Sequence, residues 1–227
     1  MASDFLEQTK DVVRDFVFGM QDGLISNLGL VLGVWQGGGG KFTILLAGLA
    51  SMFAGAFSMS TASYLSAKSQ REVYEQEIKA TKELLKKNPK QCLWSMQMIL
   101  KDEGFDKKEI AMMCKHFMKH DKSTFMKNYI QKKVGLSEER FELPLKNAVT
   151  MFFSFLLGSL FPIVPFMFWN NGVAASMAVV GTVLALFFVG WAKTRYTHLN
   201  WFRSGLEIVL VALGAGIIGY VIGTIVG

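Results

Sequence analysis

The sequence predicts an all-α, polytopic membrane protein with five transmembrane helices and a cytoplasmic helical insert between the second and the third. Hydrophobic residues make up 51% of the 227 residues and charged residues only 19%, which is too apolar for an ordinary soluble domain. The apolar residues also gather into five stretches, each about as long as the roughly 20 residues that a helix needs to cross a bilayer. The lipid bilayer is therefore the first expected partner.

The five spans divide the chain into three expected parts. Residues 1–67 hold the first two transmembrane helices, residues 68–146 form a hydrophilic, helical cytoplasmic domain, and residues 147–227 hold transmembrane helices three to five. The predicted spans are roughly 12–35, 42–67, 147–169, 172–192 and 205–226.

The lysines and arginines predict the orientation of these spans. Of the 24 basic residues, 18 lie in the insert and only Lys41 falls on the opposite side of the membrane from the others. By the positive-inside rule, the amino terminus and the insert are cytoplasmic and the carboxyl terminus is not.

Local signals within the spans and the insert predict further features. No helix breaker occurs between residue 67 and the pair Asn88-Pro89, so the second helix should continue out of the membrane to Lys87. Two or three shorter amphipathic helices should follow, near 90–103, 107–120 and 122–134. Pro162 and Pro165 should break or kink the outer end of the third span.

The fifth span carries a small residue at every fourth position. Such a face allows two helices to approach closely, either within one chain or between two chains. Its residues are Ala215, Gly219, Gly223 and Gly227.

Several function classes have no support in the sequence. The net charge of +6 is explained by orientation, because the basic residues flank hydrophobic spans and no nucleic-acid-binding motif is present. The two cysteines, Cys92 and Cys114, form neither a disulfide framework nor a zinc-type pair. No HExxH, GxSxG or phosphate-binding glycine loop occurs, so we expect no enzyme and no bound cofactor.

Asp22 is the strongest candidate for a functional residue because it lies near the middle of the first span. A charged side chain at that depth costs about 2.5–3.5 kcal/mol on insertion scales, so it is a functional-site hypothesis by default. The same helical face carries other polar or small residues, and lipid cannot satisfy such a stripe. Its members are Asp11, Asp15, Asp22, Ser26 and Gly29.

Met59 of the second span is the expected partner of Asp22. A carboxylate oxygen with a polarisable sulfur suits a transition ion such as Fe²⁺ better than Ca²⁺ or Mg²⁺, which take oxygen ligands. Desolvation disfavours the charged carboxylate when no cation is bound, so protons and metal would compete for it. The alternatives are that Met59 is packing and that Asp22 is a hydrogen-bonded structural acid.

The insert contains weaker candidates for metal ligands. Their side-chain types suit soft or borderline metals, although the alternative interpretation is a solvated amphipathic helix with a methionine-lined underside and a solvated charged face. These candidates are Glu77, Glu83, Cys92, Met113, His116 and His120.

Three stretches closely resemble the vacuolar iron transporter family, which includes yeast and plant iron transporters and their bacterial and archaeal relatives. They are RDFVFGMQDGLISNLGLVLG, AGAFSMSTASYLSAKSQRE and FFSFLLGSLFPIVPF. The resemblance implies a five-helix homodimer that exports Fe²⁺, and often Mn²⁺, from the cytosol in exchange for protons. The metal path would lie between protomers, lined by the first two helices. The membrane would be the cell inner membrane in a prokaryote and the vacuolar membrane in a eukaryote.

On the family's motif, Asp22 takes the place of the transport aspartate and Met59 that of the transport methionine. Asp11 stands where a glutamate is usual at the cytoplasmic mouth, and we expect Asp11 and Asp15 to act as entry acids. The chain departs from the plant-type pattern at Ser51, where a second acid is expected. The insert also departs at its family metal-ligand positions, here Thr81, Leu84, Cys92, Ser95, Tyr129, Ile130 and Lys133.

These departures motivate a competing hypothesis, a transport-inactive membrane scaffold or metal sensor of the same fold. An intramembrane enzyme is a third and weaker hypothesis, because no pair of nucleophile and base is present in the spans.

Overall fold

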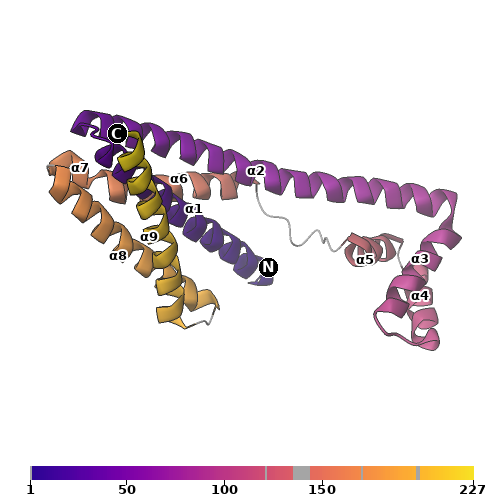
Figure 1. Cartoon of the computed structure of the whole chain (residues 1–227). Helices are drawn as coiled ribbons and strands as arrows, with labels where there is room; N and C mark the ends of the chain where they lie inside the picture. Colours follow the sequence, from indigo (N-terminus) through magenta and orange to yellow (C-terminus); the bar gives the residue numbers. More distant parts are fainter. Residues whose placement is uncertain (1, 121, 135–143, 170, 198–199) are drawn as a thin grey trace. The chain divides into compact units, whose positions relative to one another are not determined.

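The computed structural model is all-helical over the part of the chain that it describes, which is residues 2–120, 122–134, 144–169, 171–197 and 200–227 (Figure 1). The predicted all-α class is therefore confirmed. The helices are α1 (Ala2–Gln36), α2 (Lys41–Lys87), α3 (Pro89–Asp102), α4 (Lys107–His120), α5 (Lys122–Val134), α6 (Pro144–Ile163), α7 (Pro165–Phe168), α8 (Asn171–Thr197) and α9 (Trp201–Val226).

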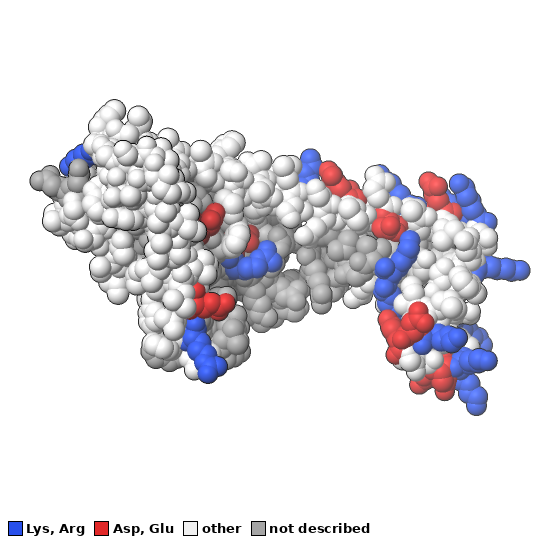
Figure 2. Space-filling view, viewed as in Figure 1, with Lys and Arg blue, Asp and Glu red and all other residues white. Residues whose placement is uncertain are grey.

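Five of these helices are long and apolar enough to cross a membrane, as predicted. The candidate spans are Val12–Gln36, Lys41–Leu84, Pro144–Ile163, Gly172–Ala192 and Gly205–Val226. Figure 2 shows the surface of the spans almost entirely white, whereas blue and red side chains gather on the insert. A row of apolar side chains on α2 is exposed, among them Phe42, Phe53 and Phe57, as expected for a helix in contact with lipid or a second protein.

The chain forms two compact units. One unit comprises Met1–Leu65 and Leu143–Gly227, and we call it the membrane unit. The other is Ser66–Glu142 and corresponds to the insert. Each unit has its own apolar core.

In the insert, helix boundaries follow the local sequence signals. Helix α2 continues to Lys87 as predicted, and Asn88 then caps α3 by accepting a hydrogen bond from the Gln91 amide at 3.3 Å. Gly104 has φ of +94° and allows the turn that joins α3 to α4. The buried core contains Cys92, Met96, Leu100, Ile110, Cys114, Phe125 and Tyr129.

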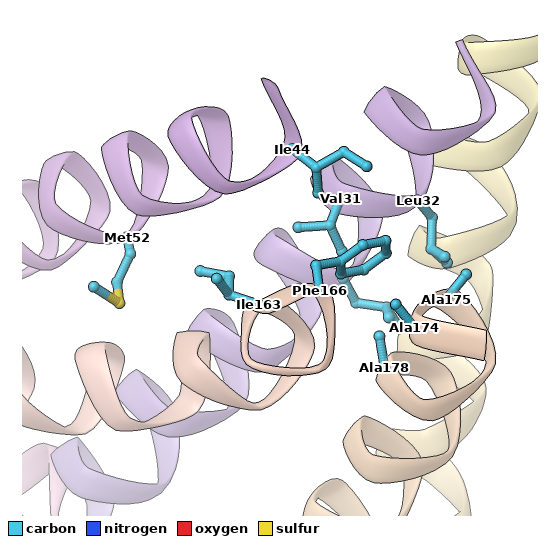
Figure 3. Packing of buried hydrophobic residues seen from close by; sticks show 10 residues of the cluster. Val31, Leu32, Ile44, Met52, Ile163, Phe166, Ala174, Ala175 and Ala178 are labelled. Carbon is cyan, nitrogen blue, oxygen red and sulfur yellow. The ribbon is translucent and has the colours of Figure 1, made fainter. Parts of the chain in front are cut away.

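In the membrane unit, the predicted break near the two prolines is confirmed. Helix α6 ends at Ile163 and the short α7 begins at Pro165. The third span is therefore shorter than the predicted 147–169, because a proline ring cannot continue the hydrogen-bond ladder of a helix. The break places Ile163 and Phe166 in the main core with Val31 and Ile44 (Figure 3).

Helix α1 contacts α6, α8 and α9, and glycines bring it close to two of them. A Cβ atom built on Gly23 would collide with the backbone carbonyl oxygen of Phe155 in α6, and one built on Gly158 would collide with that of Met20. The two backbones therefore touch, and this approach requires glycine.

The small-residue face of α9 packs within the chain, against α1. A Cβ atom on Gly219 would collide with the carbonyl oxygen of Gly29, and one on Gly223 with that of Gly33. Of the two uses that the sequence left open for this face, the structure shows the intrachain one.

Glycine substitutions in α9 test this packing. We expect Gly219→Ala to lower the stability of the folded chain in detergent by about 1–3 kcal/mol, as overpacking does. The control is Gly214→Ala in the same helix, where an added Cβ meets nothing within 4 Å. Since alanine favours helix by up to about 1 kcal/mol over glycine, the control should be neutral or stabilising. Equal melting temperatures for the two variants would contradict the close packing.

Candidate functional site

Asp22 lies on α1 next to a close contact of this helix with α6. Its neighbour Gly23 packs on the backbone of α6, while Asp22 itself is partly buried. One turn later, the exposed Ser26 donates its hydroxyl hydrogen to the backbone oxygen of Asp22. In the part of the chain that the structure describes, no hydrogen bond or ion pair engages the Asp22 carboxylate.

The path of α9 explains why the face that carries Asp22 stays open. Near its start, α9 contacts α1 on the side of Leu24, and further along it covers Gly29. Those two α1 positions lie about 140° apart around the helix, so α9 crosses from one side of α1 to another. Asp22 precedes Gly29 by seven residues, which is about two turns on the same face. Asp22 therefore lies about two turns before the point on α1 at which α9 reaches that face.

A groove continues from this open face along α1 and α9. It has a volume of about 530 Å³ and begins at Ile25 and Ser26. Its floor is formed by the glycines that α1 and α9 use for packing, and its walls are apolar. The lining residues are Ile25, Ser26, Gly29, Leu30, Gly33, Val34, Ala215, Ile218, Gly219 and Ile222.

Met59 lies on the inner face of α2 and is partly buried. It follows Met52, Gly55 and Ala56 at helical spacing, and Met52 and Ala56 are buried. Gly55 packs against the ring of Phe155, the same residue whose carbonyl oxygen packs on Gly23. Asp22 and Met59 are therefore at a similar depth, each within about one turn of a contact with Phe155.

Asp22 and a contact of α1 with α2 lie on different sides of α1 by helical spacing. Through Phe155, α6 contacts both α1 and α2 at this depth. Where α1 does meet α2, the contact is between Val31 and Gly48, and Val31 lies nine residues after Asp22, about 180° around α1. The Asp22 position is thus on the side of α1 opposite this contact.

The expected entry acids are placed differently from Asp22. Asp15 is 5% exposed, and its Oδ1 atom lies 3.2 Å from Nη2 of Arg14. A buried acid with a paired charge has a local structural explanation that Asp22 lacks. Asp11 belongs to α1, and its side chain lies outside the described residues.

In the insert, the candidate ligands engage in packing or in ion pairs. Cys92 and Cys114 belong to the apolar core, and burial raises the pKa of both thiols, although Lys133 acts in the opposite direction on Cys92. Glu77 pairs with Lys133 at 3.1 Å and Glu83 with Lys87 at 3.7 Å.

The remaining insert candidates are placed differently from one another. Met113 is partly buried beside the core, His116 is exposed, and the side chain of His120 lies outside the described residues. Within the described ranges, no group of three or more His, Cys, Asp or Glu side chains could hold a metal ion. These placements favour the packing interpretation of the insert over the ligand interpretation.

Sequence reasoning did not single out one polar residue of α1, Asn27. It is fully buried and donates a hydrogen bond to Ser159 of α6 at 2.9 Å. An amide in the middle of an apolar span was the available signal, because such side chains hydrogen-bond across membrane helices.

The reactivity of the cysteines tests their placement. A thiolate, rather than a thiol, attacks thiol reagents, so raised pKa values and burial should both slow the reaction. At pH 8 we expect Cys92 and Cys114 to react slowly in the folded chain and quickly after denaturation. The matched control is Met112→Cys, because Met112 is 71% exposed on the same helix as Cys114. Native cysteines that react as fast as the introduced one would show that they are not core residues.

Comparisons with known proteins cover nearly the whole chain. A sequence model described as the VIT family matches residues 13–224. Vacuolar iron transporter 1 of Oryza sativa subsp. japonica is 29% identical over 213 residues, which is 92% of this chain and 83% of that protein. Vacuolar iron transporter 1 of Eucalyptus grandis is 30% identical over 204 residues, or 88% of this chain and 81% of the relative.

A fungal relative gives the same result. Protein CCC1 of Saccharomyces cerevisiae is 29% identical over 187 residues, which is 81% of this chain and 58% of the yeast protein. The three matched relatives come from two kingdoms, and the family match includes all five candidate spans except the first residue of the first and the last two of the fifth. The chain belongs to the VIT family.

Proposed function

We propose that this chain is a multi-pass membrane transporter that exports Fe²⁺ from the cytosol in exchange for protons, with Asp22 holding the ion in transit. Mn²⁺ is a second proposed substrate. The names of the plant relatives, vacuolar iron transporters, support iron as the substrate. The observation that carries the proposal is a carboxylate in the middle of a span with no partner in the described part of the chain.

A carboxylate at this depth in a membrane is costly. An unpaired charge inside a membrane is stabilised by a cation, by protonation or by water. Fe²⁺ supplies the first and a proton the second, so the two ligands exclude each other at one side chain. Exchange follows from this competition: a proton that arrives from the acidic side displaces the metal, and metal from the cytosol displaces the proton.

We further propose that the working form is a homodimer. One carboxylate offers few ligands to a transition ion, and Asp22 faces away from the side on which its own α2 packs. A second copy against the open face of α1 would bring further oxygen or sulfur ligands to Asp22, Met59 among them. The groove between α1 and α9 begins at Ser26 on that face and runs toward the other end of the spans.

The proposed location is an integral membrane position with the amino terminus and the insert in the cytosol. The distribution of basic residues supports that orientation, since 23 of the 24 lysines and arginines lie on one side of the predicted spans. In a eukaryote the membrane would be that of the vacuole, and in a prokaryote the inner membrane. Asp15, near the cytosolic end of α1, is the proposed entry acid together with Asp11.

A second candidate function is a transport-inactive scaffold or metal sensor of the same fold. The insert favours this candidate, because its cysteines lie in the core and Glu77 and Glu83 pair with lysines. Ser51 in place of a second acid also favours it.

Transport into proteoliposomes separates the two functions. With an imposed pH gradient and an internal metal-quenched dye, we expect wild type to move Fe²⁺ and Asp22→Asn to be at least 100-fold slower, a loss of roughly 3 kcal/mol or more. Glu207→Gln is the matched control, because Glu207 is an exposed acid near the start of α9, and it should transport normally. Equal transport by wild type and Asp22→Asn would remove Asp22 from the site. Absence of any divalent-ion transport by wild type would support the scaffold or sensor.

A further inference from the structure

A buried polar contact joins α1 to α6 in the middle of the membrane unit. Asn27 and Ser159 are both 0% exposed, and Nδ2 of Asn27 donates to Oγ of Ser159 at 2.9 Å. The Ser159 hydroxyl in turn donates to the carbonyl oxygen of Phe155 at 2.7 Å. The same Asn27 nitrogen also reaches the Gly23 carbonyl oxygen at 3.4 Å.

This contact is directional, whereas the contacts around it are not. Near Asn27, α1 meets α6 through Gly19, Gly23 and Gly158. Glycine contacts set how closely two helices approach and which face of α1 meets α6, but they include no hydrogen bond from an α1 side chain to α6. A hydrogen bond does fix it, because its energy falls steeply when donor and acceptor are misaligned.

The contact also leaves one polar atom of Asn27 unsatisfied in the described part of the chain. Oδ1 of Asn27 is buried and has no hydrogen-bond partner in the described part of the chain. Leaving a buried carbonyl oxygen unsatisfied is unfavourable, and apolar groups of the same shape are often as stable or more so. Buried polar atoms are normally hydrogen-bonded, and exceptions to this rule are typical of functional positions.

We propose that Asn27 is a positioning residue for Asp22, acting through Ser159. Asn27 lies five residues after Asp22 on one continuous helix, about 140° around its axis. Fixing the rotation of α1 at Asn27 therefore fixes the direction of the Asp22 carboxylate and keeps it on the open face. The proposal rests on the transport function proposed above.

Two variants break the contact from opposite sides. Asn27→Leu removes the unsatisfied oxygen, keeps a side chain of similar shape and leaves the Ser159 hydroxyl bonded to Phe155, so no new unpaired group appears. Ser159→Ala removes the acceptor with the loss of one atom. We expect both to raise the KM for Fe²⁺ on the order of 10-fold or more, since a displacement of about 1 Å can cost on the order of 100-fold. The maximal rate should change much less.

Stability separates positioning from a structural role. The melting temperature of Asn27→Leu in detergent should equal or exceed that of wild type, because leucine has a similar shape and carries no unsatisfied polar atom, while its KM rises. The matched control is Thr182→Val, because Thr182 on α8 is also fully buried with an unsatisfied hydroxyl. Its KM should not change, and its stability should be equal or higher.

The outcomes distinguish this inference from the proposed function. If wild type transports Fe²⁺, Asp22→Asn does not, and both contact variants keep the wild-type KM, Asn27 has no positioning role. Lower stability with an unchanged KM would make the contact purely structural. If Asp22→Asn transports as wild type does, the proposed function fails first and the positioning role fails with it.

Discussion

The membrane unit depends on the contact of the α1 backbone with two other backbones. Gly23 lies on the carbonyl of Phe155 in α6, and Gly29 lies beneath Gly219 of α9. In a bilayer the lipid tails are as apolar as the side chains, so close van der Waals packing and hydrogen bonds hold helices together. Asp22 lies directly before the first of these two contacts along α1, so its position is set by helices that cannot move without separating from α1.

The same contacts explain the difference between the two described acids of α1. Asp15, near the start of the first span, has the Arg14 guanidinium beside it. Asp22 is about two turns deeper and has no such partner among the described residues, and α9 reaches its face only further along the helix. An unpaired carboxylate at that depth is stabilised by a mobile positive charge, and a divalent cation or a proton can supply it. The close packing of α1 on α6 and α9 therefore leaves the Asp22 carboxylate partly buried and without a partner among the described residues.

The five spans, the extension of α2 to Lys87 and the break before Pro165 could be predicted from the sequence, because each follows from local hydropathy or proline chemistry. The relative placement of Asp22 and Met59 could not be predicted from the sequence. Each residue lies on a polar or soft stripe of its own helix, but the interposed Phe155 of α6 depends on how three helices pack. Helical spacing gives the face of one helix and not the direction of its neighbour.

The central claim is that the Asp22 carboxylate exchanges a proton for a divalent metal ion inside the membrane. Its most direct test is labelling of the full chain with a hydrophobic carbodiimide, which modifies protonated carboxyl groups in apolar surroundings, followed by peptide mass spectrometry. The account predicts that Asp22 is modified without metal and is protected by Fe²⁺ under anaerobic conditions. Modification of Asp22 to the same extent with and without Fe²⁺ would contradict it.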